Sequence, residues 1–212
     1  MKILGIDEAG RGCVLGDLFV GAYCCTESQL KEIQAAGATD SKKLSAKKRT
    51  TILSALENIG TGSVVQISPK QIDSGNINTL EEEAFATLIV KYKPQKVYID
   101  APAHPRAIPA FQKRLTARII SAGVKVPDMV IEPKADLTYP IVGAASIFAK
   151  VKRDLSIHAL GEVGSGYPSD PKTRTWIKGF LIRKEELPNC VRKRWGTIEK
   201  LKQEVQSEAS QS

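Results

Sequence analysis

The chain has 212 residues, and its 31 Lys and Arg against 23 Asp and Glu give a formal net charge of +8. That length suits one domain with at most a small appendage, and the apolar fraction of 42% is enough for a sizeable core. The charged fraction of 25% is ordinary, which argues against intrinsic disorder. No window reaches the roughly 18 apolar residues of a membrane span, and Asp7 and Glu8 lie where a signal peptide needs apolar residues. We therefore expect a soluble, cytoplasmic, basic protein with no membrane partner.

The positive charge is concentrated in two segments. Residues 171–200 hold nine basic and three acidic side chains, a net +6, together with both tryptophans of the chain. Residues 40–49 hold five basic side chains and one acidic side chain, a net +4. One such run alone is more typical of a solvated helix face. Two runs in a chain of this length indicate a polyanionic partner about as strongly as they indicate solvated helices.

The first half of the chain predicts three strands and two or more helices. An apolar strand over 3–6 ends at Asp7 and Glu8, and a second apolar run over 14–25 is broken at Gly16 and Asp17. The elements that follow are a helix over 45–56, a strand over 63–67, a helix start at Ser68-Pro69, and a helix that begins at a capping box of Thr79 and Glu82 and ends at Lys93-Pro94.

The second half alternates strands and helices before it changes character. The expected elements are a strand over 96–100, a helix over about 106–121, a strand over 129–131, a helix from Asp136 onward, a turn-rich break at 164–171, two short basic helices, and a loose polar tail over 206–212. This order predicts an α/β fold. Its mixed sheet has an antiparallel meander at the start and parallel crossovers afterwards, and a helical appendage follows.

Four carboxylates stand at or just after the ends of predicted strands: Asp7, Glu8, Asp100 and Asp136. Parallel sheets place ligand sites at the carboxyl ends of their strands, and the first and fourth strands are candidates to be neighbours. Converging carboxylates repel one another unless a cation neutralises them. The four cysteines form no Cys-x-x-Cys pair and the two histidines lie far apart, so Mg²⁺ or Mn²⁺ suits the site better than zinc.

Two such ions about 4 Å apart would bind the attacking and leaving oxygens of a phosphodiester. A single acidic residue at a strand end is more often a cap or a turn residue than a metal ligand. For the set of four this structural interpretation is weaker, but it stays open. A two-carboxylate glycosidase is another chemistry for paired acids. It is disfavoured because such clefts are lined with aromatic side chains, and only 6% of this chain is aromatic.

Six strings taken together are far more specific than any one of them. They are, in chain order, Gly5-Ile-Asp-Glu-Ala-Gly-Arg-Gly12, Asp40-Ser-Lys-Lys-Leu-Ser45, Tyr98-Ile-Asp100, Lys134-Ala-Asp136, Ala144-Ala-Ser-Ile147 with Ala149-Lys-Val-Lys-Arg-Asp154, and Gly164-Ser-Gly-Tyr-Pro-Ser-Asp-Pro-Lys-Thr173. With these strings the chain closely resembles ribonuclease HII, the type 2 ribonuclease H, from residue 1 to about 200, in the form typical of the archaeal and eukaryotic branch.

The resemblance implies an RNase H-like catalytic domain over 1–163, with a five-stranded mixed sheet flanked by helices. It also implies a C-terminal helical substrate-binding region over 164–212. The implied activity is endonucleolytic cleavage of the RNA strand of RNA–DNA hybrids and incision on the 5′ side of ribonucleotides embedded in duplex DNA. Two divalent ions, Mg²⁺ or Mn²⁺, would serve the hydrolysis, and the products would carry 3′-hydroxyl and 5′-phosphate ends.

Carried over by position, the resemblance also implies roles for individual residues. Asp7, Glu8, Asp100 and Asp136 match the metal-binding carboxylates of the family. Gly10, Arg11 and Gly12 match a loop that senses the 2′-hydroxyl through close approach of the backbone, which glycine permits. Tyr167 matches a tyrosine that packs against a deoxyribose, although a tyrosine in such a turn is more often a plain packing residue. Lys42 matches a phosphate-contacting lysine, and Lys43 and Arg49 are neighbours with weaker support.

The resemblance suggests a monomer. The tail over 203–212 has no aromatic residue, so the clamp-binding peptide of some relatives is not evident here. Asp17 departs from the proline that many members carry, which affects the local turn and not the chemistry. We assign no role to His104 or His158. Two other functions stay open: a non-catalytic basic nucleic-acid-binding module, and another nuclease of the same fold, such as a junction resolvase.

Overall fold

The computed structural model describes residues 1–38 and 44–210, and a five-stranded sheet forms its centre. The strands are β1 (Lys2–Ala9), β2 (Leu18–Thr26), β3 (Thr61–Ile67), β4 (Lys96–Asp100) and β5 (Asp128–Glu132). Their spatial order is β3-β2-β1-β4-β5, with β1, β2 and β3 antiparallel and β4 and β5 parallel to β1. The predicted mixed α/β sheet is confirmed, and β1 and β4 are the predicted neighbours.

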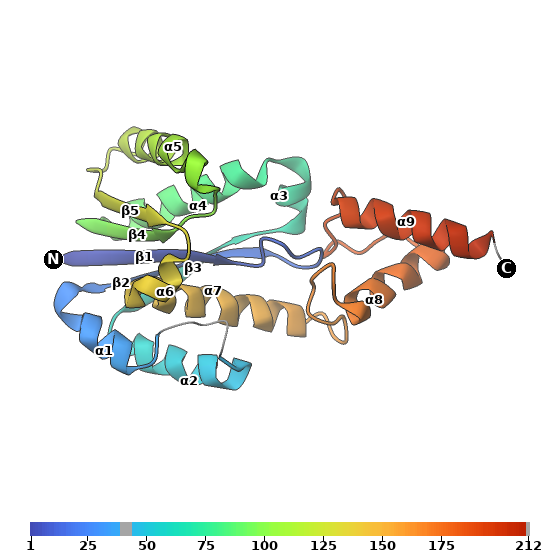
Figure 1. The fold of residues 1–212 in the computed structure, drawn as a ribbon, viewed down its shortest axis with the longest axis horizontal. Coiled ribbons are helices and arrows are strands. Elements are labelled where there is room, and N and C mark those ends of the chain that lie inside the picture. Colours follow the sequence, from blue (N-terminus) through green and yellow to red (C-terminus); the bar gives the residue numbers. More distant parts are fainter. Residues whose placement is uncertain (39–43, 211–212) are drawn as a thin grey trace.

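Helices cover both faces of the sheet (Figure 1). One face carries α3 (Pro69–Ser74), α4 (Ile77–Tyr92) and α5 (Ile108–Ser121), and the other carries α1 (Leu30–Ala35), α2 (Ala46–Glu57) and α7 (Pro140–His158). The short elements are η1 (Glu27–Gln29), η3 (Pro105–Ala107) and α6 (Ala135–Thr138). No helix in the described part of the chain has the length and apolar character needed to cross a membrane.

The alternation of side chains along β1 produces the two hydrophobic layers. Leu4 and Ile6 are buried in the layer beneath α4 and α5, whereas Ile3 is buried in the layer beneath α7. At Gly5 a Cβ would lie 2.2 Å from the carbonyl oxygen of Ile141. Only glycine therefore lets α7 pack directly on β1, and this contact places the middle of α7 beside the carboxyl end of that strand.

The C-terminal helices α8 (Pro171–Ile182) and α9 (Gly196–Ala209) form an extension at the far end of α7 (Figure 1). Their apolar cluster includes Ile177 and Leu201, but also Val14 and Leu15 from the connection between β1 and β2. The extension therefore packs around the loop that follows the β1 carboxylates. The division into domains at residues 163 and 164 remains a prediction.

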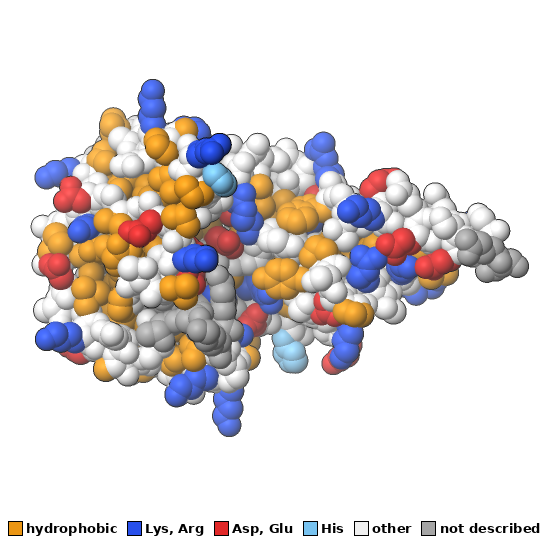
Figure 2. All heavy atoms as spheres, viewed as in Figure 1, with side chains coloured by type: hydrophobic (Ala, Val, Ile, Leu, Met, Phe, Trp, Pro, Cys, Tyr) orange, Lys and Arg blue, Asp and Glu red, His pale blue; other side chains and the backbone are white. Residues whose placement is uncertain are grey.

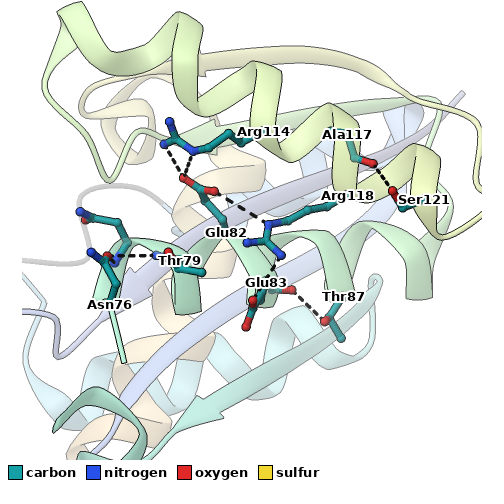
Figure 3. A network of polar contacts seen from close by, with 10 residues as sticks. Asn76, Thr79, Glu82, Glu83, Thr87, Arg114, Ala117, Arg118 and Ser121 are labelled. Atoms are coloured by element: carbon teal, nitrogen blue, oxygen red, sulfur yellow. Dashed lines mark hydrogen bonds and ion pairs between the residues drawn. The ribbon is translucent and has the colours of Figure 1, made fainter. Parts of the chain in front are cut away.

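One helix cap was predicted correctly and one wrongly. Ser68 caps α3 in a capping box with Gln71, and Ser45, where a helix was expected to begin, caps α2. The cap of α4 is Asn76, whose Oδ1 accepts hydrogen bonds from the backbone N–H groups of Asn78 and Thr79 (Figure 3). The predicted box of Thr79 and Glu82 does not form, because the better-placed Asn76 starts the helix three residues earlier.

Glu82 instead joins α4 to α5. Its carboxylate accepts hydrogen bonds from Arg114 at 2.5 and 2.7 Å and lies 3.9 Å from the guanidinium of Arg118, which also binds Glu83 (Figure 3). Glu82 is 3% exposed, so this carboxylate needs its arginine partners.

The prediction of a loose tail from residue 206 is wrong for residues 206–209, because α9 continues to Ala209. Glu204 and Glu208, near the end of α9, form ion pairs with Arg174 and Lys178 of α8. Ile198 and Leu201 of the same helix are buried against α8 and its surroundings. These tertiary contacts stabilise a helix whose sequence alone reads as a polar tail.

Candidate active site

Three of the four predicted carboxylates converge at one end of the sheet. Asp7 near the end of β1 and Asp100 at the end of β4 lie on neighbouring parallel strands, and Asp136 follows from α6. One carboxylate oxygen from each of these three residues lies within 4.8 Å of the others. Asp7 is 4% and Asp136 is 2% exposed, whereas Asp100 is partly exposed.

Local backbone contacts position this cluster. The Asp7 carboxylate accepts a 2.7 Å hydrogen bond from the N–H of Glu8. The turn after β5 passes through Lys134 in a left-handed conformation, with φ of 60°, and then the N–H of Ala135 donates a 3.0 Å hydrogen bond to Asp100. The start of α6 is therefore tied to β4, which brings Asp136 over the strand ends.

Burial and repulsion from a neighbouring carboxylate raise the pKa of Asp7. For Asp7 the pKa rises from 3.8 to about 7, chiefly because burial removes the carboxylate from water and secondly because Asp100 is close. A hydrogen bond with Ser146 and the charge of Lys150 act in the opposite direction. Three oxygen donors that repel one another are a donor set suited to a hard divalent cation, and the residues present therefore fit Mg²⁺ or Mn²⁺.

Glu8 lies beside the cluster and does not contribute an oxygen to it. Successive residues of a strand point to opposite faces, which separates Glu8 from Asp7. Burial raises the pKa of Glu8, and a hydrogen bond from the backbone of Arg11 and the Arg11 charge oppose that rise. Glu8 thus lies between the carboxylate cluster and the glycine-rich loop that follows it.

A cavity of about 340 Å³ joins Asp7, Glu8 and Asp100 to most of the other predicted site residues, and Asp136 is not part of its lining. Its lining residues are Asp7, Glu8, Ala9, Gly10, Arg11, Gly12, Arg49, Asp100, Lys150, Arg153, Asp154 and Tyr167. The lining therefore combines acidic side chains, basic side chains and the ring of Tyr167. Lys42 and Lys43 lie outside the described residues.

The loop Gly10–Gly12 lines the cavity and is fixed by contacts with neighbouring segments. Gly10 has φ of +92°, a conformation that favours glycine, and a Cβ there would lie 2.8 Å from the carbonyl oxygen of Asp17. The guanidinium of Arg11 forms an ion pair with the buried Glu81 of α4 and a 2.6 Å hydrogen bond with Asn78. The Arg11 side chain thus anchors the loop to α4.

Tyr167 contacts this loop at Gly12. Its ring carbon Cε1 is 3.8 Å from the position a Cβ would take on Gly12, and the guanidinium of Arg153 lies 4.8 Å from the ring centroid. The side chain is 37% exposed, so one face is open to a ligand. Burial of the remainder raises the pKa of its hydroxyl, and the charge of Arg153 opposes this rise.

Arg49 lies in the cavity and takes part in an ion pair. It donates hydrogen bonds to the carbonyl oxygen of Leu44 and to Asp154, the latter at 2.7 Å. His104 and His158 are both exposed, and neither lines the cavity. His104 has a local structural contact, since its Nδ1 accepts a hydrogen bond from the backbone N–H of Arg106.

Sequence reasoning gave no role to several residues that the structure places here. Lys150 lines the cavity and donates a 2.8 Å hydrogen bond to Ser146, one helical turn earlier on α7. Arg153 follows on the same helix, packed on Tyr167. The spacing of three to four residues along α7 was the available signal. Arg192 contacts the Gly10–Gly12 loop from 180 residues away in sequence, and no local pattern marks it.

The basic segment over 171–200 is less available to a polyanion than its charge suggests. Arg174, Lys178, Arg183 and Lys193 form ion pairs with glutamates, and Arg192 is fully buried. Figure 2 shows basic and acidic side chains next to one another on the C-terminal extension. Lys172, in contrast, is exposed and lines a shallow hollow that shares Arg153 and Asp154 with the carboxylate cavity.

Comparison with known proteins identifies relatives over the whole chain. The family model for ribonuclease HII matches residues 4–198. The ribonuclease HII of Thermococcus sibiricus is 39% identical over 221 aligned positions, covering 100% of this chain and 96% of the relative. The ribonuclease HII of Archaeoglobus fulgidus is 40% identical, covering 95% and 97% of the two chains.

Solved structures show the same arrangement of elements. The ribonuclease H2 of Pyrococcus horikoshii superposes with a TM-score of 0.84 at 37% identity, covering 97% of this chain and 99% of that one. The Archaeoglobus fulgidus ribonuclease HII, solved in complex with PCNA, gives a TM-score of 0.83 at 36% identity, covering 94% and 96%. Bst-RNase HIII in complex with Mn²⁺ is 19% identical with a TM-score of 0.80, covers 98% of this chain and 71% of that chain, and shares the fold.

Proposed function

The chain belongs to the ribonuclease HII family, and from this premise we propose that it incises duplex DNA on the 5′ side of embedded ribonucleotides, leaving 3′-hydroxyl and 5′-phosphate ends. Family membership makes it a type 2 ribonuclease H, an endonuclease that acts on the RNA of RNA–DNA hybrids and depends on divalent metal. Our proposal adds two points to this: specificity for the bond on the 5′ side of an embedded ribonucleotide, and a site for two metal ions.

One observation supports this proposal above the others. Asp7 and Asp100 of the carboxylate cluster line a single cavity together with the Gly10–Gly12 loop, and Tyr167 lies against Gly12 of that loop. A scissile phosphate at the carboxylates would therefore have its neighbouring sugar at the loop. A non-catalytic binding module has no need of three converging acids, two of them buried, and a junction resolvase has no need of a backbone loop beside them.

In this proposal Asp7, Asp100 and Asp136 hold the metal, with Glu8 completing the set from the side. When bound, two divalent ions would activate the attacking water and stabilise the charge of the leaving 3′ oxygen. The remaining steps fall to the chain itself. The Gly10–Gly12 backbone contacts the 2′-hydroxyl, which distinguishes a ribose from a deoxyribose. Tyr167 packs against the next sugar, and Arg49, together with Lys42 and Lys43, contacts phosphates.

Nicking of three matched duplexes tests the proposal. The first carries one ribonucleotide in a DNA strand, the second is all DNA, and the third is an RNA–DNA hybrid of the same sequence. Metal-dependent cutting of the first and third, abolished by EDTA, is expected. Failure of the purified protein to nick the first duplex with Mg²⁺ or Mn²⁺ would overturn the proposed specificity, and equal cutting of the all-DNA duplex would favour a resolvase.

We also propose that the protein acts as a monomer, since the cavity is formed by residues of one chain. Light scattering at working concentration should give the mass of a single 23.1 kDa chain. A dimer mass would contradict this part of the proposal. The absence of an aromatic residue from the tail leads us to expect no binding of this tail peptide to a sliding clamp.

A further inference from the structure

We propose that Arg192 is a positioning residue that holds the Gly10–Gly12 loop in its ribose-contacting form. Through this side chain the C-terminal extension would control the rate at which a ribonucleotide is incised. This inference rests on the proposed function, because it assumes that the loop contacts the scissile ribonucleotide.

The guanidinium of Arg192 binds the loop through three backbone carbonyls. Its Nη2 donates to Gly10 at 2.7 Å, its Nη1 to Arg11 at 2.8 Å, and its Nε to Gly16 at 3.1 Å. The backbone N–H of Arg192 donates to a fourth carbonyl of the same segment, that of Val14, at 2.9 Å. One residue of the extension therefore satisfies acceptors along the whole segment from residue 10 to residue 16.

Burial of the charged Arg192 guanidinium costs free energy, which suggests that the side chain is kept for a function and not for stability. Arg192 is 0% exposed, and burial lowers its pKa. The side-chain hydrogen bonds found for it in the described part of the chain all go to neutral carbonyls, and its guanidinium lies 5.1 Å from the Trp195 ring centroid. An apolar side chain of similar volume would fill this space at lower cost. A planar guanidinium, however, fixes several carbonyls at once, which an ammonium cannot do.

The loop is thereby held from two sides. On the body side, Glu81 and Asn78 of α4 bind the Arg11 side chain. On the extension side, Arg192 binds the Gly10 and Arg11 carbonyls. The carbonyl of Gly166 accepts hydrogen bonds from the N–H groups of Val14 and Leu15, and the next residue is Tyr167. The extension therefore fixes the position of Tyr167 relative to the loop beside it.

Loss of the guanidinium would remove one partner from each of three carbonyls, those of Gly10, Arg11 and Gly16. The Gly10 carbonyl would keep only its 3.2 Å hydrogen bond from the N–H of Cys13, and the segment would rearrange to satisfy the others. The carboxylate cluster belongs to β1, β4 and α6, and Arg192 makes no hydrogen bond to it among the described residues. The expected defect is therefore in the alignment of the ribose, which affects the rate of incision, while metal binding and grip on the duplex persist.

The test compares Arg192→Met and Arg192→Lys with a matched control, Arg183→Met. Arg183 belongs to the same extension, pairs with Glu185, and makes no hydrogen bond to the Gly10–Gly12 loop or to Tyr167 among the described residues. For each variant we would measure the melting temperature with and without Mn²⁺, the Kd for a duplex with one ribonucleotide, and the single-turnover incision rate at saturating protein. All rates would be taken well below the lowest melting temperature.

Arg192→Met should lower the single-turnover rate by about 10- to 100-fold while changing Kd by less than about 3-fold. Its melting temperature should rise on Mn²⁺ addition as much as that of the wild type. Arg192→Lys should recover part of the rate, and Arg183→Met should keep all of it. Should Arg192→Met fail to fold, the lysine variant alone decides, with a reduced rate at normal Kd expected.

An unchanged rate in the Arg192 variants would overturn the inference. So would a rate loss accompanied by an equal loss of duplex affinity or of the Mn²⁺ response, because that pattern indicates general distortion. A wild-type protein that does not incise the duplex would instead overturn the proposed function, so the two failures are distinguishable.

Discussion

Replacement of Asp7 by asparagine should stabilise the metal-free protein at neutral and alkaline pH. Burial and the nearby Asp100 raise the pKa of Asp7 from 3.8 to about 7, whereas in the unfolded chain this carboxyl is free of both influences. A raised pKa means that the folded state loses the proton less readily than the unfolded state does. The folded state is therefore destabilised progressively as pH rises from about 4 to about 7, and the penalty is complete above that range.

The structure bounds the size of this effect. A rise in pKa from 3.8 to about 7 corresponds to at most about 4 kcal/mol at pH 8. Asparagine keeps an oxygen that can accept the hydrogen bond from the N–H of Glu8, but it replaces the second oxygen by an amide group that has to find an acceptor. We therefore expect about half of the bound, near 2 kcal/mol, which for a chain of this length raises the melting temperature by about 4 to 8 °C.

The assay is thermal unfolding in EDTA at pH 5 and pH 8, with the exposed Asp128→Asn as the control variant. Asp7→Asn should be more stable than the wild type at pH 8, with most of the difference lost at pH 5, where the wild-type carboxyl is largely protonated. Added Mn²⁺ should stabilise the wild type and have little effect on the variant. A variant that is less stable at pH 8, or equally stabilised at both pH values, would refute the reasoning.

Two further predictions concern the substrate side of the cavity. Tyr167→Ala should reduce incision at a single ribonucleotide more than it reduces binding, because the ring lies beside the loop and is partly open; equal losses in both assays would refute its assigned role. Lys172→Ala should lower the slope of log Kd against log salt by about 0.9, whereas Lys178→Ala, already paired with Glu204 and Glu208, should leave it nearly unchanged. Equal effects of the two lysines would show that the extension binds phosphates without regard to its internal ion pairs.

The sequence was sufficient to predict the elements that place the carboxylates. A short apolar strand ending at Asp7 and another ending at Asp100 indicate parallel neighbours whose ends meet, and β1 and β4 are such neighbours. The rule that parallel strands carry ligand sites at their carboxyl ends supplied the rest. Local patterns also identified the helix that begins at Ser45 and the cap at Ser68, because a helix start depends on residues within one turn.

The features that were missed depend on contacts between distant segments. Thr79 with Glu82 is a plausible capping box, but Glu82 is needed by Arg114, which lies on a different helix. The net charge over 171–200 did not reveal that α9 neutralises α8, because the paired residues are about 30 positions apart. Arg192 read as one base in a basic run, and only the packed structure shows it bound to Gly10 and Arg11.

The position of the cut tests the central claim most directly. A duplex with one ribonucleotide, labelled at either end of the modified strand, should yield with Mg²⁺ or Mn²⁺ a single product pair. The upstream fragment should end in a deoxynucleotide with a 3′-hydroxyl, and the downstream fragment should begin with the 5′-phosphorylated ribonucleotide. A cut on the 3′ side of the ribonucleotide, or cuts scattered along the strand, would contradict the arrangement in which the carboxylate cluster and the Gly10–Gly12 loop act on adjacent parts of one nucleotide junction.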